Sequence, residues 1–199
     1  MWLLPAPLVL ASKSAVRRAV LEAAGIPVEV VPADVDERAI EAQAGSPAPV
    51  EVAALLARSK ASAVSGRMLG RVVVGADQTL ALGTQRFSKP PDRAAARTQL
   101  LALRGQTHAL HSAIAVVRDT TVLYDRVEEA RLTMRSFSDD FLDRYLDHAG
   151  AGATNSVGGY QLERIGIHLF DQVDGDHFTI LGMPLLPLLG FFRQAGFVA

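Results

Sequence analysis

Residues 8–25 read LVLASKSAVRRAVLEAAG, and this stretch decides the fold. Its first four residues form an apolar run, and the polar turn SKS at residues 12–14 follows at once. Beyond the turn, apolar residues recur at the spacing of a helix until Gly25, a residue type that commonly ends one. The stretch therefore predicts a buried strand, a short turn and a helix N-terminus, the unit from which α/β sheets are built.

Strands and helices alternate along the rest of the chain. The hydrophobic pattern predicts strands at 26–31, 71–76, 106–117, 121–134 and 166–173, and helices at 50–64, 92–103, 138–148 and from Pro184 onward. Only three residues separate the two longest strands, so we expect them to form an antiparallel hairpin. No internal repeat or linker divides the sequence. The pattern predicts an α/β or α+β protein with a mixed sheet.

Composition excludes several classes of protein. The chain of 199 residues has 20 lysines and arginines against 21 aspartates and glutamates, a formal net charge of −1, which argues against nucleic-acid or acidic-membrane partners. The absence of cysteine excludes a disulfide scaffold, a thiolate zinc site and a cysteine nucleophile. Residues 1–11 are apolar but lack the leading positive charge of a secretory signal and are too short to span a bilayer. We expect a cytoplasmic protein.

The turn at residues 12–14 is the first candidate binding element. A helix N-terminus offers free backbone N–H groups and a positive dipole end, and Ser12 and Ser14 add hydroxyl donors. Arg17 and Arg18, one turn further on, supply positive charge for an anion. The simpler interpretation makes Ser14 a helix N-cap and leaves the arginines in solvent. The residues alone leave both interpretations open.

Asp77 is the second candidate because it follows the apolar strand 71–76. Ligands of open α/β sheets gather at the carboxyl ends of strands, where a carboxylate can hold a hard cation or take a proton from water. A turn-capping aspartate is the alternative. A magnesium site there needs further oxygen ligands, and the polar loop containing Asp34, Asp36 and Glu37 offers carboxylates, although acidic loops are usually only solvated.

Two lysines are further candidates. The helical register of Lys60 is ambiguous, so the residues alone favour a surface lysine, whereas Pro90 stiffens the segment that presents Lys89. The five histidines lack metal-ligand spacing, and the sequence has neither a Walker-type phosphate loop nor a nucleophile elbow. The residues by themselves indicate an α/β protein with a cationic, carboxylate-bearing cleft.

Taken in chain order, these segments resemble the Maf family of nucleoside triphosphate pyrophosphatases. Residues 8–18 (LVLASKSAVRR) are similar to the opening signature of that family, Leu-x-Leu-Ala-Ser-x-Ser-Pro-x-Arg-Arg. The other similar motifs are VPADVDE at 31–37, ARSKA at 57–61, GADQ at 75–78, SKP at 88–90, GYQLE at 159–163 and GDHFTILGMPL at 175–185. The resemblance covers nearly the whole chain, with the motifs in the same order.

The resemblance implies a reaction and a set of site residues. Asp77 would be the general base that activates a water molecule to attack the α-phosphorus, with a nucleoside monophosphate and pyrophosphate as products. Glu37 would join Asp77 in holding a divalent metal cation, Mg²⁺ or Mn²⁺. The residues implied to bind the nucleoside triphosphate are Ser12, Ser14, Arg17, Lys60 and Lys89, with Gln161 in the pocket near the metal or the nucleotide.

The resemblance also implies a fold, an assembly and a cellular task. It predicts one domain over residues 1–199, with a twisted mixed sheet flanked by helices and two lobes around a central nucleotide-binding cleft. Family members are often homodimers, so we expect a homodimer here. The implied task is the removal of non-standard or surplus nucleotides.

Four positions depart from the family pattern or distinguish its branches. Ala15 replaces a proline and Ser88 replaces a glycine. Val16 stands where many members have an arginine, and Gln78 rather than threonine follows Asp77, as in the branch associated with 7-methyl-GTP. The other branch prefers dTTP and UTP and usually carries that arginine. We therefore hypothesise a preference for a purine or methylated purine.

A non-catalytic nucleotide-binding regulator of cell division or septation is the competing function. The presence of Asp77, Glu37, Lys60 and Lys89 together favours the enzyme, because a regulator does not need all four. Metal dependence separates the two hypotheses further, since hydrolysis should disappear with a chelator whereas binding need not.

Overall fold

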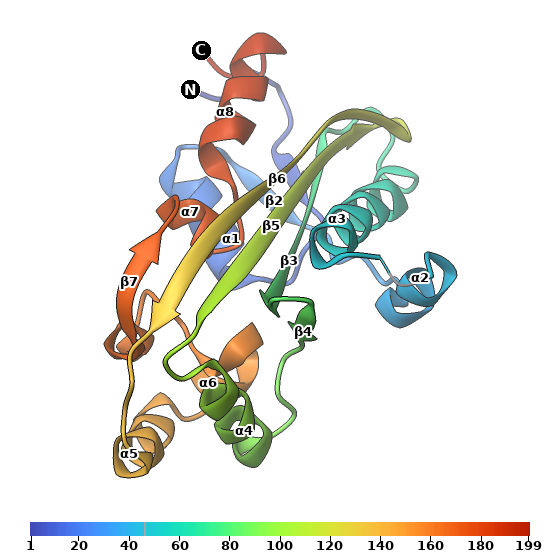
Figure 1. The fold of residues 1–199 in the computed structure, drawn as a ribbon. Coiled ribbons are helices and arrows are strands. Elements are labelled where there is room, and N and C mark those ends of the chain that lie inside the picture. The colour runs from blue at the N-terminus through green and yellow to red at the C-terminus, as the bar shows by residue number, and fades with distance from the viewer. Residues whose placement is uncertain (46) are drawn as a thin grey trace. The chain divides into compact units, whose positions relative to one another are not determined.

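A computed structural model describes residues 1–45 and 47–199 of the chain. Its strands form one mixed sheet of seven strands in the order β2-β1-β3-β5-β6-β7, with β4 paired to β3 (Figure 1). The strands are β1 (Leu8–Leu10), β2 (Val28–Val30), β3 (Val73–Leu82), β4 (Gln85–Phe87), β5 (Thr107–Arg118), β6 (Thr121–Met134) and β7 (Phe170–Asp174). The expected class, a mixed sheet flanked by helices, is confirmed.

Helices connect most of these strands. They are α1 (Ala15–Ala23), α2 (Glu37–Gln43), α3 (Pro49–Ser65), α4 (Arg93–Leu103), α5 (Asp139–Ala149), α6 (Gly152–Asn155), α7 (His177–Ile180) and α8 (Leu185–Gln194), with two 3₁₀ helices, η1 (Val157–Gly159) and η2 (Ile165–Leu169). None of the helices in the described ranges has the length and apolar character that crossing a bilayer requires.

The chain divides into two compact units. The first consists of Met1–Gln78, His111–Glu128 and His177–Ala199, and the second of Thr79–Leu110 and Glu129–Asp176. A single domain over residues 1–199 and a central nucleotide-binding cleft stay predictions.

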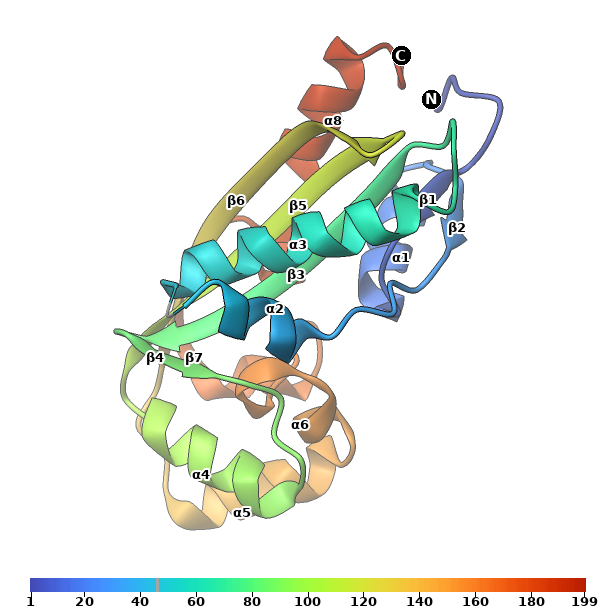
Figure 2. The same cartoon turned by 90° about the vertical axis from the view of Figure 1, so that its right-hand side faces the viewer.

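In the first unit, β1 lies parallel to both of its neighbours, with Val9 opposite Glu29 of β2 and Val73 of β3. Successive side chains of a strand point to opposite faces of the sheet, so the fully buried β1 contributes side chains to two apolar clusters, one on each face. Leu8 and Leu10 pack with apolar residues of α1 and α8, whereas Val9 packs with those of α3. Helices therefore cover both faces of the strands that carry the candidate site, and Figure 2 shows α3 lying along one face. Each fully buried aliphatic side chain contributes about 2 kcal/mol to this packing.

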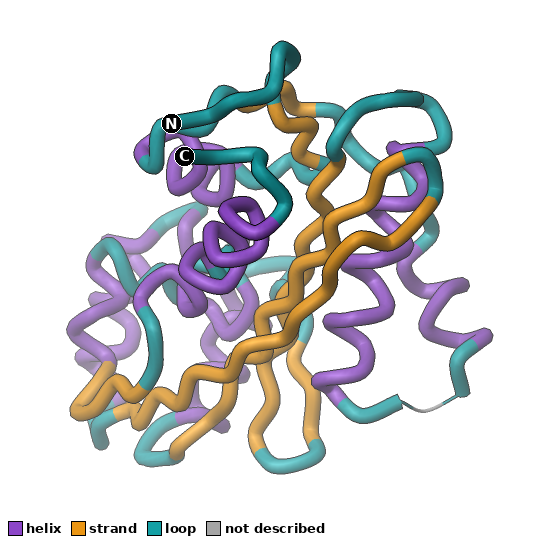
Figure 3. The backbone as a smooth tube through the Cα atoms, turned by 90° about the horizontal axis from the view of Figure 1, so that it is seen from above, coloured by secondary structure: helices purple, strands orange, loops and turns teal. Residues whose placement is uncertain are grey.

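The chain termini meet on this unit, as the view from above shows (Figure 3). Trp2 and Val198 form an antiparallel bridge, and the Trp2 ring packs edge-on against Phe192 and Phe197. The predicted hairpin of β5 and β6 is confirmed, because the two strands are neighbours in the sheet and only Asp119 and Thr120 separate them. Both of these turn residues have positive φ, as tight hairpin turns require.

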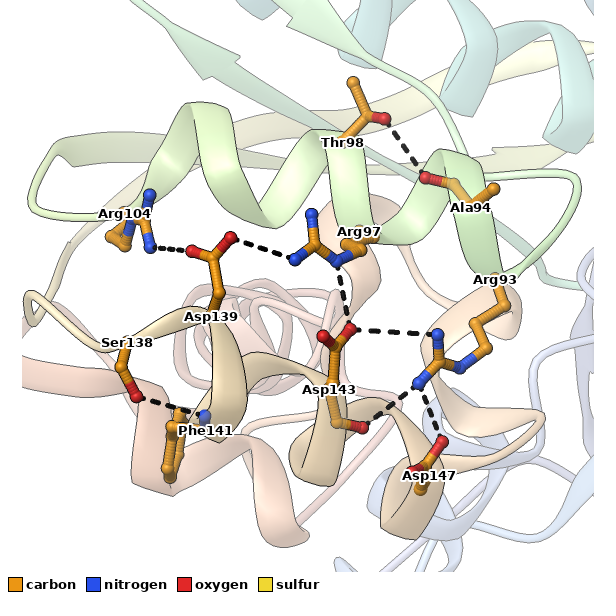
Figure 4. A network of polar contacts seen from close by, with 10 residues as sticks. All are labelled: Arg93, Ala94, Arg97, Thr98, Arg104, Ser138, Asp139, Phe141, Asp143 and Asp147. Atoms are coloured by element: carbon orange, nitrogen blue, oxygen red, sulfur yellow. Dashed lines mark hydrogen bonds and ion pairs between the residues drawn. The ribbon is translucent and has the colours of Figure 1, made fainter.

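In the second unit, α4 and α5 are joined by ion pairs between arginines and aspartates (Figure 4). Arg97 of α4 contacts both Asp139 and Asp143 of α5, at 3.0 and 2.9 Å. Arg104 also contacts Asp139, at 2.8 Å, and the Arg97 and Arg104 hydrogen bonds hold the pKa of that carboxyl below its usual value. The pairs fix α4 against α5, and α4 is the helix that follows the segment carrying Lys89.

Three predicted boundaries were wrong. Strand β3 does not end before Asp77 but continues to Leu82, because Leu80 of its extension pairs with Phe87 of β4. The predicted loop containing Asp36 and Glu37 contains a helix start, since Asp36 caps α2 by accepting a hydrogen bond from the Ala39 N–H at 3.0 Å.

The third boundary is the start of the last strand. Residues 165–169 form a 3₁₀ helix rather than the predicted strand, and β7 begins at Phe170. Gly166 packs against the Gln161 backbone so closely that a Cβ atom would lie 2.4 Å from the Gln161 carbonyl oxygen. This compact turn cannot extend as a strand.

Candidate active site

In the turn between β1 and α1, backbone N–H groups hold the hydroxyls of Ser12 and Ser14 in place. Ser14 is the N-cap of α1, and its Oγ accepts a hydrogen bond from the Arg17 N–H at 3.3 Å. Ser12 Oγ accepts one from the Ser14 N–H at 3.2 Å. The N-cap interpretation of Ser14 is therefore confirmed. Binding of triphosphate by Ser12 and Ser14 stays a prediction.

Asp77 lies inside β3, where its side chain is only 11% exposed. Lys60 reaches it from α3, and its Nζ donates a hydrogen bond to Asp77 Oδ1 at 2.6 Å. The Lys60 side chain is 12% exposed, so the surface-lysine interpretation was wrong. Lys60 faces the sheet because α3 packs directly on Gly75, where a Cβ atom would lie 2.2 Å from the Ala57 carbonyl oxygen.

Glu37 brings a second carboxylate to the same ammonium group. It is the first residue of α2, half exposed, and its Oε1 lies 2.8 Å from Lys60 Nζ. One cation therefore serves two anions, Asp77 from the strand and Glu37 from the helix. That Glu37 and Asp77 together hold a divalent metal stays a prediction, as do the roles of Arg17 and Lys60 towards the triphosphate.

Arg17 extends the cluster on the side of α1. Its Nε donates to the Gly182 carbonyl oxygen at 2.8 Å, and its Nη1 donates to the Ala76 carbonyl oxygen at 2.7 Å and to Ser12 Oγ at 3.3 Å. Arg18, by contrast, is exposed and pairs with Glu22 at 2.8 Å on the outer face of α1. Of the two neighbouring arginines, Arg17 alone reaches the site.

Burial and charge act on Asp77 in opposite directions. Burial raises the pKa of the Asp77 carboxyl, and the positive charges of Lys60 and Arg17 partly offset that rise. Burial likewise lowers the pKa of the Arg17 guanidinium, against the opposing charges of Asp77 and Glu37. A carboxylate with a raised pKa is a better proton acceptor than an ordinary one, which suits a general base.

The remaining predicted site residues, Lys89 and Gln161, belong to the second unit. Lys89 is exposed in the loop after β4, and Gln99 of α4 fixes that loop by donating to the Ser88 carbonyl oxygen at 2.8 Å. Gln161 is half-buried between η1 and η2. The structure brings Ser12, Arg17, Glu37, Lys60 and Asp77 together within the first unit. The roles of Lys89 and Gln161 stay predictions.

Sequence reasoning missed a layer of residues behind Asp77. Ser112, a fully buried serine in the apolar run of β5, donates to the Thr179 carbonyl oxygen at 2.7 Å and accepts from Gln78 Nε2 at 2.8 Å. A polar residue inside such a run was the signal that could have identified it. Gly182, whose carbonyl oxygen accepts the hydrogen bond from Arg17 Nε, has a φ of +80°. Its place in the 175–185 motif did not reveal this contact.

The donor chemistry of the cluster suits a divalent cation. Asp77 Oδ1 and Glu37 Oε1 both lie within hydrogen-bond distance of Lys60 Nζ, so the two oxygens converge on one small region. Mg²⁺ binds through one or two carboxylates together with substrate phosphates and water. In the described residues, no group of three or more histidine, cysteine, aspartate or glutamate side chains has an arrangement for holding a metal by itself. The residues fit a cation that the substrate helps to hold.

Comparison with known proteins gives a consistent result. A family model described as Maf-like protein matches residues 7–195. A protein of Rhodopseudomonas palustris (strain BisB5) named nucleoside triphosphate pyrophosphatase is 58% identical over 194 residues, which cover 98% of this chain and 96% of the relative. Another of that name, from strain HaA2, is 56% identical over 199 residues, covering 100% and 98%.

A third relative carries a more specific name. The Rhizobium etli protein named 7-methyl-GTP pyrophosphatase is 50% identical over 192 residues, which cover 95% of this chain and 96% of the relative. A solved structure, a HAM1 protein from Coxiella burnetii, aligns with a TM-score of 0.41 at 16% identity over 64% of this chain and 72% of that one. A likeness that weak carries no argument.

Proposed function

Because the chain belongs to the Maf-like protein family, we propose that it is a nucleoside triphosphate pyrophosphatase with its reacting centre at Asp77. The observation that carries the proposal is the buried Asp77 carboxylate held at 2.6 Å from the Lys60 ammonium, beside Glu37. The same three residues stand in motifs that the sequence shares with the family. The relatives named as pyrophosphatases match over nearly their full length.

The proposed reaction is attack of water on the α-phosphorus. Asp77 takes a proton from the water molecule as the water oxygen forms a bond to the α-phosphorus. The bond from that phosphorus to the oxygen bridging to the β-phosphate breaks, and the electron pair leaves on pyrophosphate. The products are a nucleoside monophosphate and pyrophosphate, with one proton released from Asp77 to solvent. Phosphoryl transfer of this kind depends mainly on positioning and on charge neutralisation.

The chain supplies positive charge and hydrogen-bond donors for that neutralisation. Ser12, Ser14 and the N-terminus of α1 offer donors, and Lys60 and Lys89 offer cationic groups to the triphosphate, with Gln161 beside the nucleotide. Arg17, which the resemblance also implies as a triphosphate-binding residue, directs its Nε and Nη1 to the Gly182 and Ala76 carbonyl oxygens and to Ser12. Asp77 and Glu37, whose carboxylates both contact Lys60 Nζ, would hold a divalent cation, Mg²⁺ or Mn²⁺. When bound, the cation neutralises negative charge on the phosphates.

The proposed substrate preference is a purine or methylated purine, with 7-methyl-GTP as the leading candidate. Val16 and Gln78 support it, as does the name of the Rhizobium etli relative. We further propose a cytoplasmic homodimer that removes non-standard or surplus nucleotides. No observation favours the non-catalytic regulator, which is an outcome of the test below.

Pyrophosphate release from a panel of nucleotides, with Mg²⁺ or Mn²⁺, tests the proposal. We expect metal-dependent release that a chelator abolishes and that falls by about 1,000-fold in Asp77→Asn, since that variant loses its proton acceptor. Asp34→Asn is the matched control, because Asp34 is an exposed carboxylate whose ion pair with Lys13 spans 3.9 Å.

The outcomes separate the alternatives. No release by a folded protein that still binds nucleoside triphosphate would favour the regulator. Release that survives in Asp77→Asn would keep the enzyme but remove Asp77 as the base. Comparable turnover of dTTP, UTP and 7-methyl-GTP would contradict the substrate preference alone.

A further inference from the structure

The residue before Asp77 is tied to the segment that spans the end of α7 and the two residues after it. The Ala76 carbonyl oxygen accepts a hydrogen bond from Arg17 Nη1 at 2.7 Å, and the Gly182 carbonyl oxygen accepts one from Arg17 Nε at 2.8 Å. A single guanidinium therefore bridges β3 to Gly182. Both acceptors are backbone atoms, so the bridge fixes the course of the chain as well as side chains.

The residue after Asp77 is tied to the same segment. Gln78 Nε2 lies 3.2 Å from the Thr179 carbonyl oxygen and 3.0 Å from that of Ile180. Ser112 supports the arrangement from β5 by donating to the Thr179 carbonyl oxygen. Both neighbours of Asp77 are thus anchored to one four-residue turn, residues 179–182, which we name the anchor turn.

The anchor turn is itself a closed unit. Its last residue, Gly182, donates its N–H to the Thr179 carbonyl oxygen at 3.0 Å, and Met183 donates to Phe178 at 2.9 Å. Gly182 has a φ of +80°, and a Cβ atom there would lie 3.2 Å from Arg17 Nη2 and 3.3 Å from Arg17 Nε. Glycine at this position lets the guanidinium lie directly against the turn.

Most hydrogen-bond donors of the Arg17 guanidinium are used by acceptors within the protein. Nε and Nη1 make three hydrogen bonds to Gly182, Ala76 and Ser12, which leaves Nη2 as the nitrogen available to a ligand. Each of the two parallel donor pairs that an arginine can present to a phosphate, Nε with Nη2 and Nη1 with Nη2, therefore has one nitrogen engaged by the protein. This geometry is that of a clamp more than of a phosphate-binding group.

We propose that Arg17 and Gln78 are positioning residues, which hold the Asp77 carboxylate in place by clamping both of its neighbours to the anchor turn. The motif at residues 175–185 then supports the Asp77 carboxylate through its two neighbours, and glycine at position 182 leaves room for the Arg17 guanidinium. The inference rests on the proposed function for its kinetic consequences, whereas the clamp itself is independent of any activity.

Steady-state kinetics of Arg17→Met, Arg17→Lys and Gln78→Leu test the proposal. Misplacing a reacting group by about 1 Å costs roughly 100-fold in rate, so we expect kcat to fall by about that factor in Arg17→Met while KM for the nucleotide changes by less than about 3-fold. Arg17→Lys should recover part of kcat, because an ammonium reaches one of the carbonyls. Arg18→Met is the matched control, since Arg18 is exposed and pairs with Glu22 of the same helix, and should keep both constants.

The two clamp residues should also act as a unit. In the double variant Arg17→Met/Gln78→Leu, the loss in kcat should be smaller than the product of the two single losses, because both act through the anchor turn. A rise in KM of about tenfold or more with kcat retained in Arg17→Met would overturn the proposal and make Arg17 a phosphate-binding residue.

Amide hydrogen exchange gives a readout that does not depend on catalysis. Exchange over residues 76–78 and 179–183 should be roughly tenfold faster in Arg17→Met and in Gln78→Leu than in the unmodified protein, and unchanged in Arg18→Met. Unchanged exchange in both clamp variants would contradict the clamp. If Arg17→Met does not fold, Arg17→Lys, which keeps the positive charge but reaches only one of the two carbonyls, takes its place in the exchange measurement. Absence of pyrophosphatase activity in the unmodified protein would defeat the proposed function while leaving the exchange result interpretable.

Discussion

At the scale of single residues, Lys60 balances two carboxylates with one ammonium. Its Nζ lies 2.6 Å from Asp77 and 2.8 Å from Glu37, and its charge is the largest influence that opposes the burial-driven rise in the Asp77 pKa. Lys60→Met should raise that pKa further. The acid limb of the pH–rate profile should therefore move to higher pH, because Asp77 acts as a base only when deprotonated.

The same change should cost stability. Removing one partner of a buried ion pair leaves an uncompensated charge, so we expect unfolding in urea to show a loss on the order of 3 kcal/mol for Lys60→Met. Lys13→Met is the control, because Lys13 is exposed and its ion pair is long, at 3.9 Å. An acid limb that stays in place in Lys60→Met would contradict the electrostatic account of Asp77.

His108 gives a separate pH dependence in the second unit. It is fully buried, its Nε2 lies 2.7 Å from the Tyr160 hydroxyl, and burial lowers its pKa to about 4. In the unfolded chain, His108 binds a proton as the pH falls through about 6.5, whereas in the folded chain it does so only near pH 4. The free energy of unfolding is therefore unaffected by His108 above pH 6.5 and decreases as the pH falls from there towards 4.

We expect the free energy of unfolding to fall by about 2 kcal/mol through His108 alone between pH 8 and pH 5. His108→Gln should remove that part of the loss, and His168→Gln, at an exposed histidine, should not. Denaturant unfolding at the two pH values is the measurement. Equal pH dependence in the His108 variant and the unmodified protein would show that His108 does not titrate as argued.

At the scale of elements, the contact between α3 and β3 places Lys60. A Cβ atom on Gly75 would lie 2.2 Å from the Ala57 carbonyl oxygen and 2.6 Å from the Ala61 backbone nitrogen, so Gly75→Ala must displace the helix. We expect a loss of about 2 kcal/mol in unfolding free energy and a fall in kcat, because the displaced helix carries Lys60.

The control for that substitution is Gly66→Ala. A Cβ atom on Gly66, at the end of the same helix, would make an ordinary contact of 3.6 Å with the Ser62 carbonyl oxygen. Thermal unfolding and kinetics of both variants compare the two glycines. A Gly75 variant as stable and active as the Gly66 variant would mean that α3 does not need its close approach to β3.

Local patterns predicted the elements well where a pattern extends over a whole element. The strand, turn and helix of residues 8–23 follow from an apolar run, a serine cap and helical spacing, and the structure has them as expected. Local patterns failed at β3, because the polar pair Asp77 and Gln78 resembled a strand end. The strand continues there because β4 pairs with it, which is a tertiary effect that no local pattern contains.

The site was predictable in its residue types and not in its contacts. Glu37, Lys60 and Asp77 were identified from motifs, yet the register that turns Lys60 towards the sheet depends on how α3 packs on Gly75. Ser112 and Gly182 were missed because their roles exist only through backbone carbonyls of distant residues. Such contacts leave only weak signals in the sequence.

At the scale of the whole molecule, the first unit is assembled from three separate stretches of chain. Arg17 lies near the N-terminus of the chain, Asp77 in its middle part and Gly182 near its C-terminus. They come together only when the parallel strands β1 and β3 have paired and the C-terminal segment has packed against them. The proposed reacting centre therefore forms only in the completed fold, which is why we expect it to be sensitive to changes in α3 and in the anchor turn.

The central claim is that water attacks the α-phosphorus with Asp77 as the base. Hydrolysis of the nucleotide that ranks first in the panel, in heavy-oxygen water with Mg²⁺ and product analysis by mass spectrometry, tests it most directly. The account predicts one heavy oxygen in the nucleoside monophosphate, none in the pyrophosphate, and loss of this labelling in Asp77→Asn. Label in pyrophosphate or in inorganic phosphate, or labelling that survives in Asp77→Asn, would contradict it.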